Sequence, residues 1–425
     1  MAATARGDSV DHGLLAGLKV VEFSAHHVAF AGRLLADMGA DVVVVEPPDG
    51  DPSRHRSPVV EGDGLSSSIW WEHYGASKRS VAADFTVAAD REFVERLIQG
   101  ADVMLEGEPP GRLEALGLGP ALWCAEVPSL IWTSLTSFGH FDLRSSEPFS
   151  DLTILAEGGP VWSCGYDDHS QPPVRGLGNQ GFQLGGMFAV MGTLTAVVER
   201  ITSGRGQHVD TSLVAAAGVS TELASYYWLV ANETVVRQTG RHATAQVTTE
   251  VQVQARDGSW VHTGIGVRNP SAFAAIIDWL TELSLLDEFP DTVLLGMGAD
   301  GDVLSHPHPG ADPVAMEIMR AGRDALVFVA GKLSGYDFFL GAQRRNLQCG
   351  VVRTPNEVLS DPHLVSRGWP TPIDLPLVDR SVLYPGSWFH STAAPWTVHP
   401  APRLGQHQAE VIGELDLKEK GGPPL

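Results

Sequence analysis

The N-terminal part of the chain alternates short apolar runs with a segment of helical period. Residues 18–23 (LKVVEF) and 41–46 (DVVVVE) predict two strands buried on both faces, and residues 30–38 (FAGRLLADM) predict an amphipathic helix that ends at Gly39. A strand, a short helix and a second strand at this spacing form a βαβ unit, which requires a parallel sheet. We therefore expect the α/β class.

The same alternation continues up to a long apolar segment. Further strands are predicted at 81–84, 101–106, 130–134 and 208–211, and a further helix at 91–99. Residues 182–202 predict a helix so apolar that it must be buried. Small residues along it would let another backbone approach closely, and glycines punctuate the loop before it: Gly176, Gly178, Gly181, Gly185 and Gly186.

The remainder of the chain predicts a second, smaller domain. Residues 213–236 look helical, and 252–263 predict two short strands around an Asp257-Gly258 turn. Residues 270–345 look mostly helical, with a Gly- and Pro-rich insert at 296–313. We expect a Rossmann-like large domain built from 1–229 and 346–425, with an α+β domain inserted at 230–345.

Composition and charge narrow the functional classes. The 425 residues are 43% apolar and carry a formal charge of −22, which argues against nucleic acid or an anionic membrane as partner. Three widely spaced cysteines form neither a zinc pattern nor a disulfide framework, and the first residues contain no apolar leader, so we expect a cytoplasmic protein. No metal site is expected, because two histidines two positions apart, His306 and His308, are a weak signal by themselves.

Common catalytic motifs are missing. The turn after the first strand, Ser24-Ala25-His26-His27-Val28, lacks the G-x-G-x-x-G pattern of a nicotinamide dinucleotide site. The chain also has no G-x-S-x-G sequence of the kind that presents a hydrolase serine.

Two stretches resemble the family III CoA-transferases, which include formyl-CoA transferase, the carnitine CoA-transferases and their racemase relatives. The likeness is specific in Gly192-Thr193-Leu194 through Arg200 and in the run from Thr202 to Asp210, and it extends to Leu35–Pro48 and Ala101–Leu118. The resemblance implies an interlocked dimer in which each chain threads through a ring formed by the other. It also implies coenzyme A as the thioester substrate, with an acyl-CoA or a free carboxylic acid as the bound partner.

The resemblance also shows which catalytic group this chain lacks. In those enzymes an aspartate follows a glycine ten residues before the position of Gly192, and it attacks the acyl-CoA carbonyl to form an acyl-enzyme anhydride. Here the glycine is Gly181 and the next residue is Phe182. No Asp or Glu lies between Asp168 and Glu199, so no shift of register supplies the carboxylate.

The resemblance assigns CoA contacts to the loop after the first strand and to nearby cations. In this sequence the predicted CoA-binding residues are His26, His27, Val28, Lys78, Arg79 and Arg112. Arginine can contact two phosphate oxygens at once, whereas lysine acts as a point charge. Without the resemblance, Lys78 and Arg79 would be read as ordinary solvated cations.

Two residues remain as weak candidates for proton transfer. The racemase branch of the family uses a histidine–aspartate pair at the position of Ser150-Asp151, so Asp151 is present but serine replaces the histidine. His140, in the loop after Phe138-Gly139, is the remaining candidate base. A lone loop histidine is more often structural.

Three functions follow from these residues. The chain is either an aspartate-lacking subunit of a heteromeric CoA-transferase in carboxylic-acid or aromatic-acid metabolism, or an independent enzyme that acts on a CoA thioester without an aspartyl anhydride. The third alternative is a non-catalytic CoA-binding or structural homologue. The first requires a heterodimer with an aspartate-bearing homologue, and the others fit a homodimer.

Overall fold

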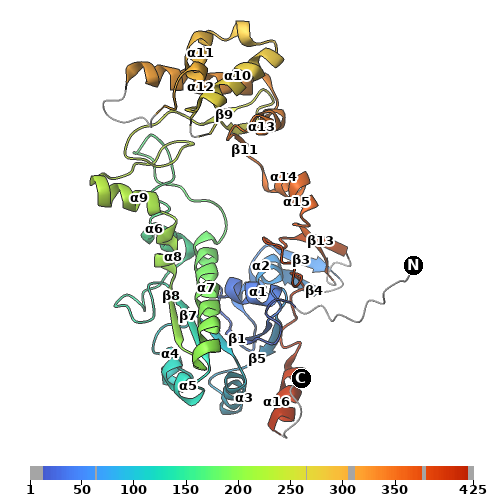
Figure 1. The fold of residues 1–425 in the computed structure, drawn as a ribbon. Helices are drawn as coiled ribbons and strands as arrows, with labels where there is room; N and C mark the ends of the chain where they lie inside the picture. The colour runs from blue at the N-terminus through green and yellow to red at the C-terminus, as the bar shows by residue number, and fades with distance from the viewer. Residues whose placement is uncertain (1–12, 63–64, 265, 305–311, 376–379, 420–425) are drawn as a thin grey trace. The chain divides into compact units, whose positions relative to one another are not determined.

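Six parallel strands form the central sheet of the larger of the chain's two units (Figure 1). The computed structural model describes residues 13–62, 65–264, 266–304, 312–375 and 380–419. Neighbouring strands run in the order β5-β2-β1-β6-β7-β8, and every pair is parallel. Their bounds are β1 (Lys19–Phe23), β2 (Asp41–Glu46), β5 (Arg79–Ala82), β6 (Val103–Glu106), β7 (Ile131–Thr136) and β8 (His208–Ser212). The α/β class and the parallel sheet are therefore confirmed.

Helices cover both faces of this sheet, as expected for strands that are apolar on both sides. On one face Val20, Val42 and Val103 pack under α1 (Ala29–Asp37), α6 (Asp151–Glu157), α7 (Gln180–Ser203) and α8 (Leu213–Val219). On the other, Val21 and Val43 pack under α3 (Ala88–Gln99), α4 (Arg112–Ala115), α5 (Pro120–Glu126) and α16 (Gln408–Glu419). When the six strands are numbered one to six along the chain, their order across the sheet is 3-2-1-4-5-6, which is that of the Rossmann fold.

The remaining elements of the larger unit are short. They are η1 (Pro52–His55), β3 (Val59–Gly62), β4 (Leu65–Ser68), α2 (Ile69–Tyr74), α9 (Glu222–Tyr226), α15 (Pro362–Ser366), β12 (Thr371–Leu375) and β13 (Arg380–Tyr384). β3 pairs with β4 and β12 with β13 as antiparallel hairpins, which the sequence did not predict.

The smaller unit packs helices around its own core. Its elements are η2 (Tyr227–Ala231), β9 (Gln252–Gln254), β10 (Trp260–His262), α10 (Pro270–Glu282), η3 (Leu286–Glu288), α11 (Thr292–Asp300), α12 (Pro313–Lys332), α13 (Gly335–Arg344), β11 (Gly350–Val351) and α14 (Pro355–Leu359). Phe273, Trp279 and Phe338 are fully buried in that core. The hairpin around Asp257-Gly258 is confirmed, because β9 and β10 pair antiparallel and Gly258 has φ +82°.

The boundaries of the two units differ from the domain boundaries that the sequence predicted. The larger consists of the described parts of Met1–Trp162, Val174–Tyr226 and Asp361–Leu425. The smaller consists of Ser163–Pro173 and Tyr227–Ser360, whereas the sequence prediction placed the small domain at 230–345.

Two predictions of local structure are wrong. The helix predicted over 213–236 is broken after α8, where the hydroxyls of Ser220 and Thr221 donate to the carbonyls of Ala217 and Gly218. A short α-helix and a single π-helical turn follow, and Asn232 then turns the chain with φ 54°. The predicted insert at 296–313 is helical at its start, since α11 extends to Asp300.

The apolar helix α7 is confirmed, and so is the close approach of another backbone to it. A Cβ placed on Gly186 would lie 3.3 Å from the backbone nitrogen of Ala31 in α1. By length and composition alone α7 could span a membrane, and 44% of its most apolar 18-residue window is buried in the described structure. Its buried side packs on the central sheet, where Ala189 and Val190 join the core.

Gly206 allows the turn after α7 to pass against the start of β7. A Cβ at this position would lie 1.9 Å from the carbonyl oxygen of Leu130, which is backbone and cannot rotate away. We expect Gly206→Ala to lower the free energy of unfolding by about 2 kcal/mol or more, measured by urea denaturation. Gly331→Ala in α12 is the control, because its Cβ would meet no atom within 4 Å. Equal stability of the two variants would contradict this packing.

Candidate active site

The loop after β1 lies where the strand order of the sheet reverses. β1 and β6 are neighbours, and the chain leaves them toward opposite edges of the sheet, which opens a crevice at their carboxyl ends. Gly107, directly after β6, contacts this loop so closely that a Cβ there would lie 2.2 Å from His27 Nε2 and 2.7 Å from Val28 Cγ2. The structure thus places the predicted residues His26, His27 and Val28 where folds of this type bind ligands.

Phe182 lies beside this loop, in the first turn of α7. Its side chain is 9% exposed. Its ring centroid is 5.7 Å from that of His26, 5.9 Å from that of His27 and 6.1 Å from that of Phe149. The His26 and Phe149 rings meet it edge-to-face, the arrangement that aromatic pairs prefer. The position therefore holds a well-packed apolar ring.

Asp151 connects α6 to the start of α7. Ser150 caps α6 with a reciprocal capping box involving Thr153, which sets Asp151 at the first helical position. Its Oδ1 accepts the backbone N–H of Phe182 at 3.1 Å, and its Oδ2 lies 3.2 Å from Arg175 Nη1. Both carboxylate oxygens therefore have partners that fix local structure, and a role of Asp151 in proton transfer stays a prediction.

His26 is held as a neutral hydrogen-bond acceptor. Its Nε2 lies 2.8 Å from Asn179 Nδ2 and 3.1 Å from Arg56 Nη1, both of which carry only donor hydrogens. Burial lowers the pKa of His26, and the positive charge of Arg56 lowers it further, although Asp51 and Asp151 act in the opposite sense. The imidazole is therefore uncharged near neutral pH, with its proton on Nδ1.

His27 is also neutral, and burial is again the main cause. Burial, followed by the neighbouring His26, lowers the pKa of His27 to about 4. Its Nε2 has no hydrogen-bond partner of normal geometry among the described residues, although the backbone of Gly107 and Leu135 lies near enough to oppose the shift. Two uncharged imidazoles therefore adjoin Phe182.

Two aromatic rings of α2 also belong to the site. Trp70 and Tyr74 of α2 stack with centroids 6.3 Å apart and an interplanar angle of 12°. The Tyr74 hydroxyl accepts from Asn179 Nδ2 at 3.2 Å and lies 3.4 Å from Gln183 Nε2.

The sequence singled out neither Asn179 nor Arg56, because a lone polar residue in a loop gives no signal until its partners are known.

The predicted CoA-binding cations are all engaged by carboxylates. Lys78 is buried with its Nζ 2.7 Å from the Glu22 carboxylate. Arg79 pairs with Asp41 at 2.7 Å and also contacts two glutamates of α16, so it holds that helix against β5. Arg112 is exposed but pairs with Glu108 at 3.1 Å. Contact of these residues with CoA stays a prediction, and in this arrangement none of the three presents an unpaired positive charge.

His140 lies in a separate polar cluster on β7 and β8. Its Nε2 is 3.5 Å from Glu114 Oε1, and its ring stands 5.2 Å from that of His208. His208 Nε2 in turn lies 2.8 Å from the Ser134 hydroxyl, and burial lowers the pKa of His208. The structure therefore does not bring His140 and Phe182 into one cluster.

Metal ligation has no support in the described residues, where no group of three or more His, Cys, Asp or Glu side chains could hold an ion. His306 and His308 lie outside those residues.

Comparison with known proteins identifies the family of the chain. The model of CoA-transferase family III matches residues 15–293. Subunit BbsE of succinyl-CoA:(R)-benzylsuccinate CoA-transferase from Thauera aromatica is 27% identical over 399 residues, 93% of each chain. Succinyl-CoA:mesaconate CoA-transferase from Haloarcula hispanica is 29% identical over 396 residues, 91% of this chain and 92% of the relative.

A solved structure shows the same architecture over nearly the whole chain. A CaiB/BaiF family protein from Brucella suis superposes with a TM-score of 0.77 and 25% identity, covering 95% of this chain and 100% of that one. The fold and this structural match define an α/β protein of the CaiB/BaiF type. This chain belongs to CoA-transferase family III.

Proposed function

We propose that this chain is the aspartate-lacking subunit of a heteromeric CoA-transferase that acts on dicarboxylic acids. A second, homologous chain would carry the aspartate that accepts the acyl group from the thioester carbonyl and releases CoA. This chain would complete the assembly and contribute to substrate binding. The observation that carries the proposal is the apolar ring of Phe182 at the position where the resemblance puts that aspartate.

The surroundings of Phe182 support a centre that does not form an anhydride. A phenyl ring can act neither as nucleophile nor as proton donor or acceptor. The adjoining carboxylate of Asp151 already accepts the Phe182 N–H and pairs with Arg175. Three neighbouring rings pack against Phe182, so the space beside it is occupied by the protein's own side chains.

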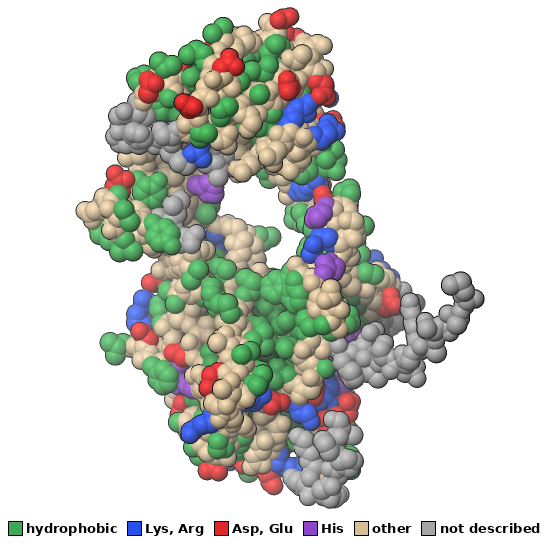
Figure 2. Space-filling view, in the orientation of Figure 1, with side chains coloured by type: hydrophobic (Ala, Val, Ile, Leu, Met, Phe, Trp, Pro, Cys, Tyr) green, Lys and Arg blue, Asp and Glu red, His purple; other side chains and the backbone are tan. Residues whose placement is uncertain are grey.

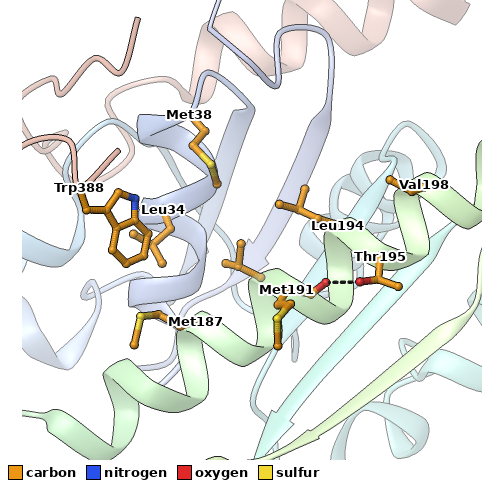
Figure 3. Close-up of a pocket in the computed structure, with 9 residues that line it drawn as sticks. Leu34, Met38, Met187, Met191, Leu194, Thr195, Val198 and Trp388 are labelled. Carbon is orange, nitrogen blue, oxygen red and sulfur yellow. Dashed lines mark hydrogen bonds between the residues drawn. The ribbon is translucent and has the colours of Figure 1, made fainter. Parts of the chain in front are cut away.

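The uncovered side of α7 supports association with another chain. Met191, Val198 and Ile201 on this helix are 55%, 66% and 81% exposed. Met191 and Val198 line an apolar groove of about 540 Å³ between α7, α1 and Trp388, in which the hydroxyl of Thr195 donates to the Met191 carbonyl (Figure 3). The groove is lined by Leu34, Met38, Met187, Val190, Met191, Leu194, Thr195, Val198 and Trp388.

Hydrophobic side chains gather on the face of the larger unit that carries α7 and α1 (Figure 2). Contiguous apolar surface of this kind is typical of a protein interface, which supports the dimer that the resemblance implies. Since the BbsE relative is itself a named subunit, we infer that a different, homologous chain covers this surface.

The substrate class comes from the relatives. Their names combine succinyl-CoA with benzylsuccinate or mesaconate, all of which are dicarboxylic acids or their thioesters. We infer that this chain's assembly exchanges CoA between two such acids.

One observation favours a second candidate function. The neutral imidazole of His27 adjoins Phe182, and its Nε2 has no hydrogen-bond partner of normal geometry among the described residues, so it is free to accept a proton beside a thioester. An independent enzyme that uses His27 without an anhydride would be fully active as a homodimer. Its activity would fall when His27 is replaced by glutamine.

Purification from the native host under mild conditions separates these functions. We expect an Asp-bearing homologue to co-purify, and we expect succinyl-CoA-dependent CoA transfer by the pair but not by either chain alone. Glu126→Gln, an exposed change outside the site, is the control for the histidine variant and should leave both association and transfer unchanged. A homodimer of this chain that transfers CoA at full rate would exclude the proposal.

A further inference from the structure

Among the residues that the structure describes, Arg56 is a cation of the site with no carboxylate partner. Its guanidinium lies over the Trp70 ring, 3.9 Å from the centroid, and its Nη1 is 3.1 Å from His26 Nε2. Trp70 is itself stacked on Tyr74. The guanidinium is therefore fixed from two sides although the residue is exposed to solvent.

Its unpaired charge contrasts with the other cations around the crevice. Lys78, Arg112 and Arg175 each have a carboxylate within 3.2 Å, and Arg54 and Arg79 each have one within 2.7 Å. In the part of the chain that the structure describes, no Asp or Glu lies within ion-pair distance of Arg56. A guanidinium has five donor hydrogens, and the contact with His26 uses one of its nitrogens.

The position of Arg56 relates this free charge to the candidate active site. The Nε2 atom of His26 accepts from Arg56 Nη1 and from Asn179 Nδ2. The ring of His26 also meets the Phe182 ring edge-on. One imidazole thus separates the guanidinium from the Phe182 ring. A neutral His26 adds no competing positive charge, so the positive charge at this end of the site is that of Arg56.

We propose that Arg56 binds an oxyanion of the substrate, and that this oxyanion is the free carboxylate of a dicarboxylic acyl group. The planar fork of a guanidinium matches a carboxylate, and stacking on Trp70 orients the fork before the ligand arrives. A phosphate of CoA offers the same chemistry and is the second possible source. The inference rests on the proposed function, because it requires that the assembly binds acyl-CoA.

Equilibrium binding to the natively purified assembly tests this assignment. The ligands are succinyl-CoA and butyryl-CoA, which differ in the distal carboxylate, and CoA and 3′-dephospho-CoA, which differ in a phosphate. We expect Arg56→Gln to weaken succinyl-CoA binding by about tenfold to a hundredfold and to leave butyryl-CoA binding unchanged. Arg56→Lys should recover part of the loss, since it keeps the charge without the fork.

Arg320→Gln is the matched control, because Arg320 is an arginine of the smaller unit already paired with carboxylates. An Arg56→Gln loss that is equal for succinyl-CoA and butyryl-CoA, and absent for 3′-dephospho-CoA, would overturn the acyl-carboxylate assignment in favour of phosphate. Unchanged affinity for every ligand would overturn the inference while leaving the proposed function intact. An unmodified assembly that binds no thioester would overturn both.

Discussion

Lys78→Met is expected to lower the free energy of unfolding by about 3–5 kcal/mol, because it leaves a carboxylate buried without its counter-charge. Lys78 Nζ lies 2.7 Å from the Glu22 carboxylate, and both side chains are 1% exposed. The same ammonium donates to the Ala29 carbonyl at 2.8 Å. Burial raises the pKa of Glu22, and the attraction of Lys78 opposes that rise. Urea denaturation at neutral pH measures the effect.

Two further variants make this prediction specific. Lys332→Met removes a lysine whose pair with Glu288 is 40% and 55% exposed, so its effect should stay below about 1 kcal/mol. The double variant Glu22→Gln/Lys78→Met removes both charges and should recover much of the lost stability. If Lys78→Met were as stable as Lys332→Met but bound CoA more weakly, Lys78 would be a CoA ligand and not half of a structural pair.

Stability should also fall as the pH rises through neutrality, because of Glu106. This side chain is 1% exposed at the end of β6. Burial raises its pKa from 4.5 to about 7, although hydrogen bonds from Ser134, the Glu108 N–H and the Trp132 indole act to lower it. A carboxyl whose pKa is higher in the folded state contributes its full stabilisation below pH 4.5 and loses it as the pH rises through 7. The loss is on the order of 3 kcal/mol.

Glu106→Gln isolates this contribution. The amide cannot ionise, so the variant should be more stable than the unmodified protein at pH 8, and its free energy of unfolding should change less between pH 5 and pH 8. Glu126→Gln, at an exposed position, should leave the pH dependence unchanged. A Glu106→Gln profile parallel to that of the unmodified protein would show that Glu106 is ionised throughout this range.

The elements around the site were predictable because their signals are local. The apolar runs that became β1, β2 and β6 are continuous, and the helix between β1 and β2 has a clear period and ends at a glycine. The loop His26-His27-Val28 was selected by the family resemblance, and its place at the crevice follows because loops after parallel strands meet at one edge of a sheet. The apolar character of residues 182–202 predicted the long helix correctly, but its complete burial was not found, since only 44% of its apolar window is buried in the described structure.

The partners of the side chains were not predictable, because they join distant parts of the chain. Lys78 meets Glu22 from 56 positions away, and Asn179 meets His26 from 153 positions away. A basic residue is read from sequence as free to bind phosphate, and only the fold shows that a carboxylate has neutralised it. Arg56 was missed for the converse reason, since its lack of a carboxylate partner is visible only in three dimensions.

Covalent trapping tests the central claim most directly. The natively purified assembly is incubated with succinyl-CoA, the acyl-enzyme anhydride is captured with hydroxylamine or borohydride, and the modified side chain is located by peptide mass spectrometry. We expect no modified Asp or Glu in this chain and one modified aspartate in its companion. A modified acidic residue in this polypeptide, purified without a companion, would contradict the assignment of Phe182 to the position of the acyl-accepting aspartate.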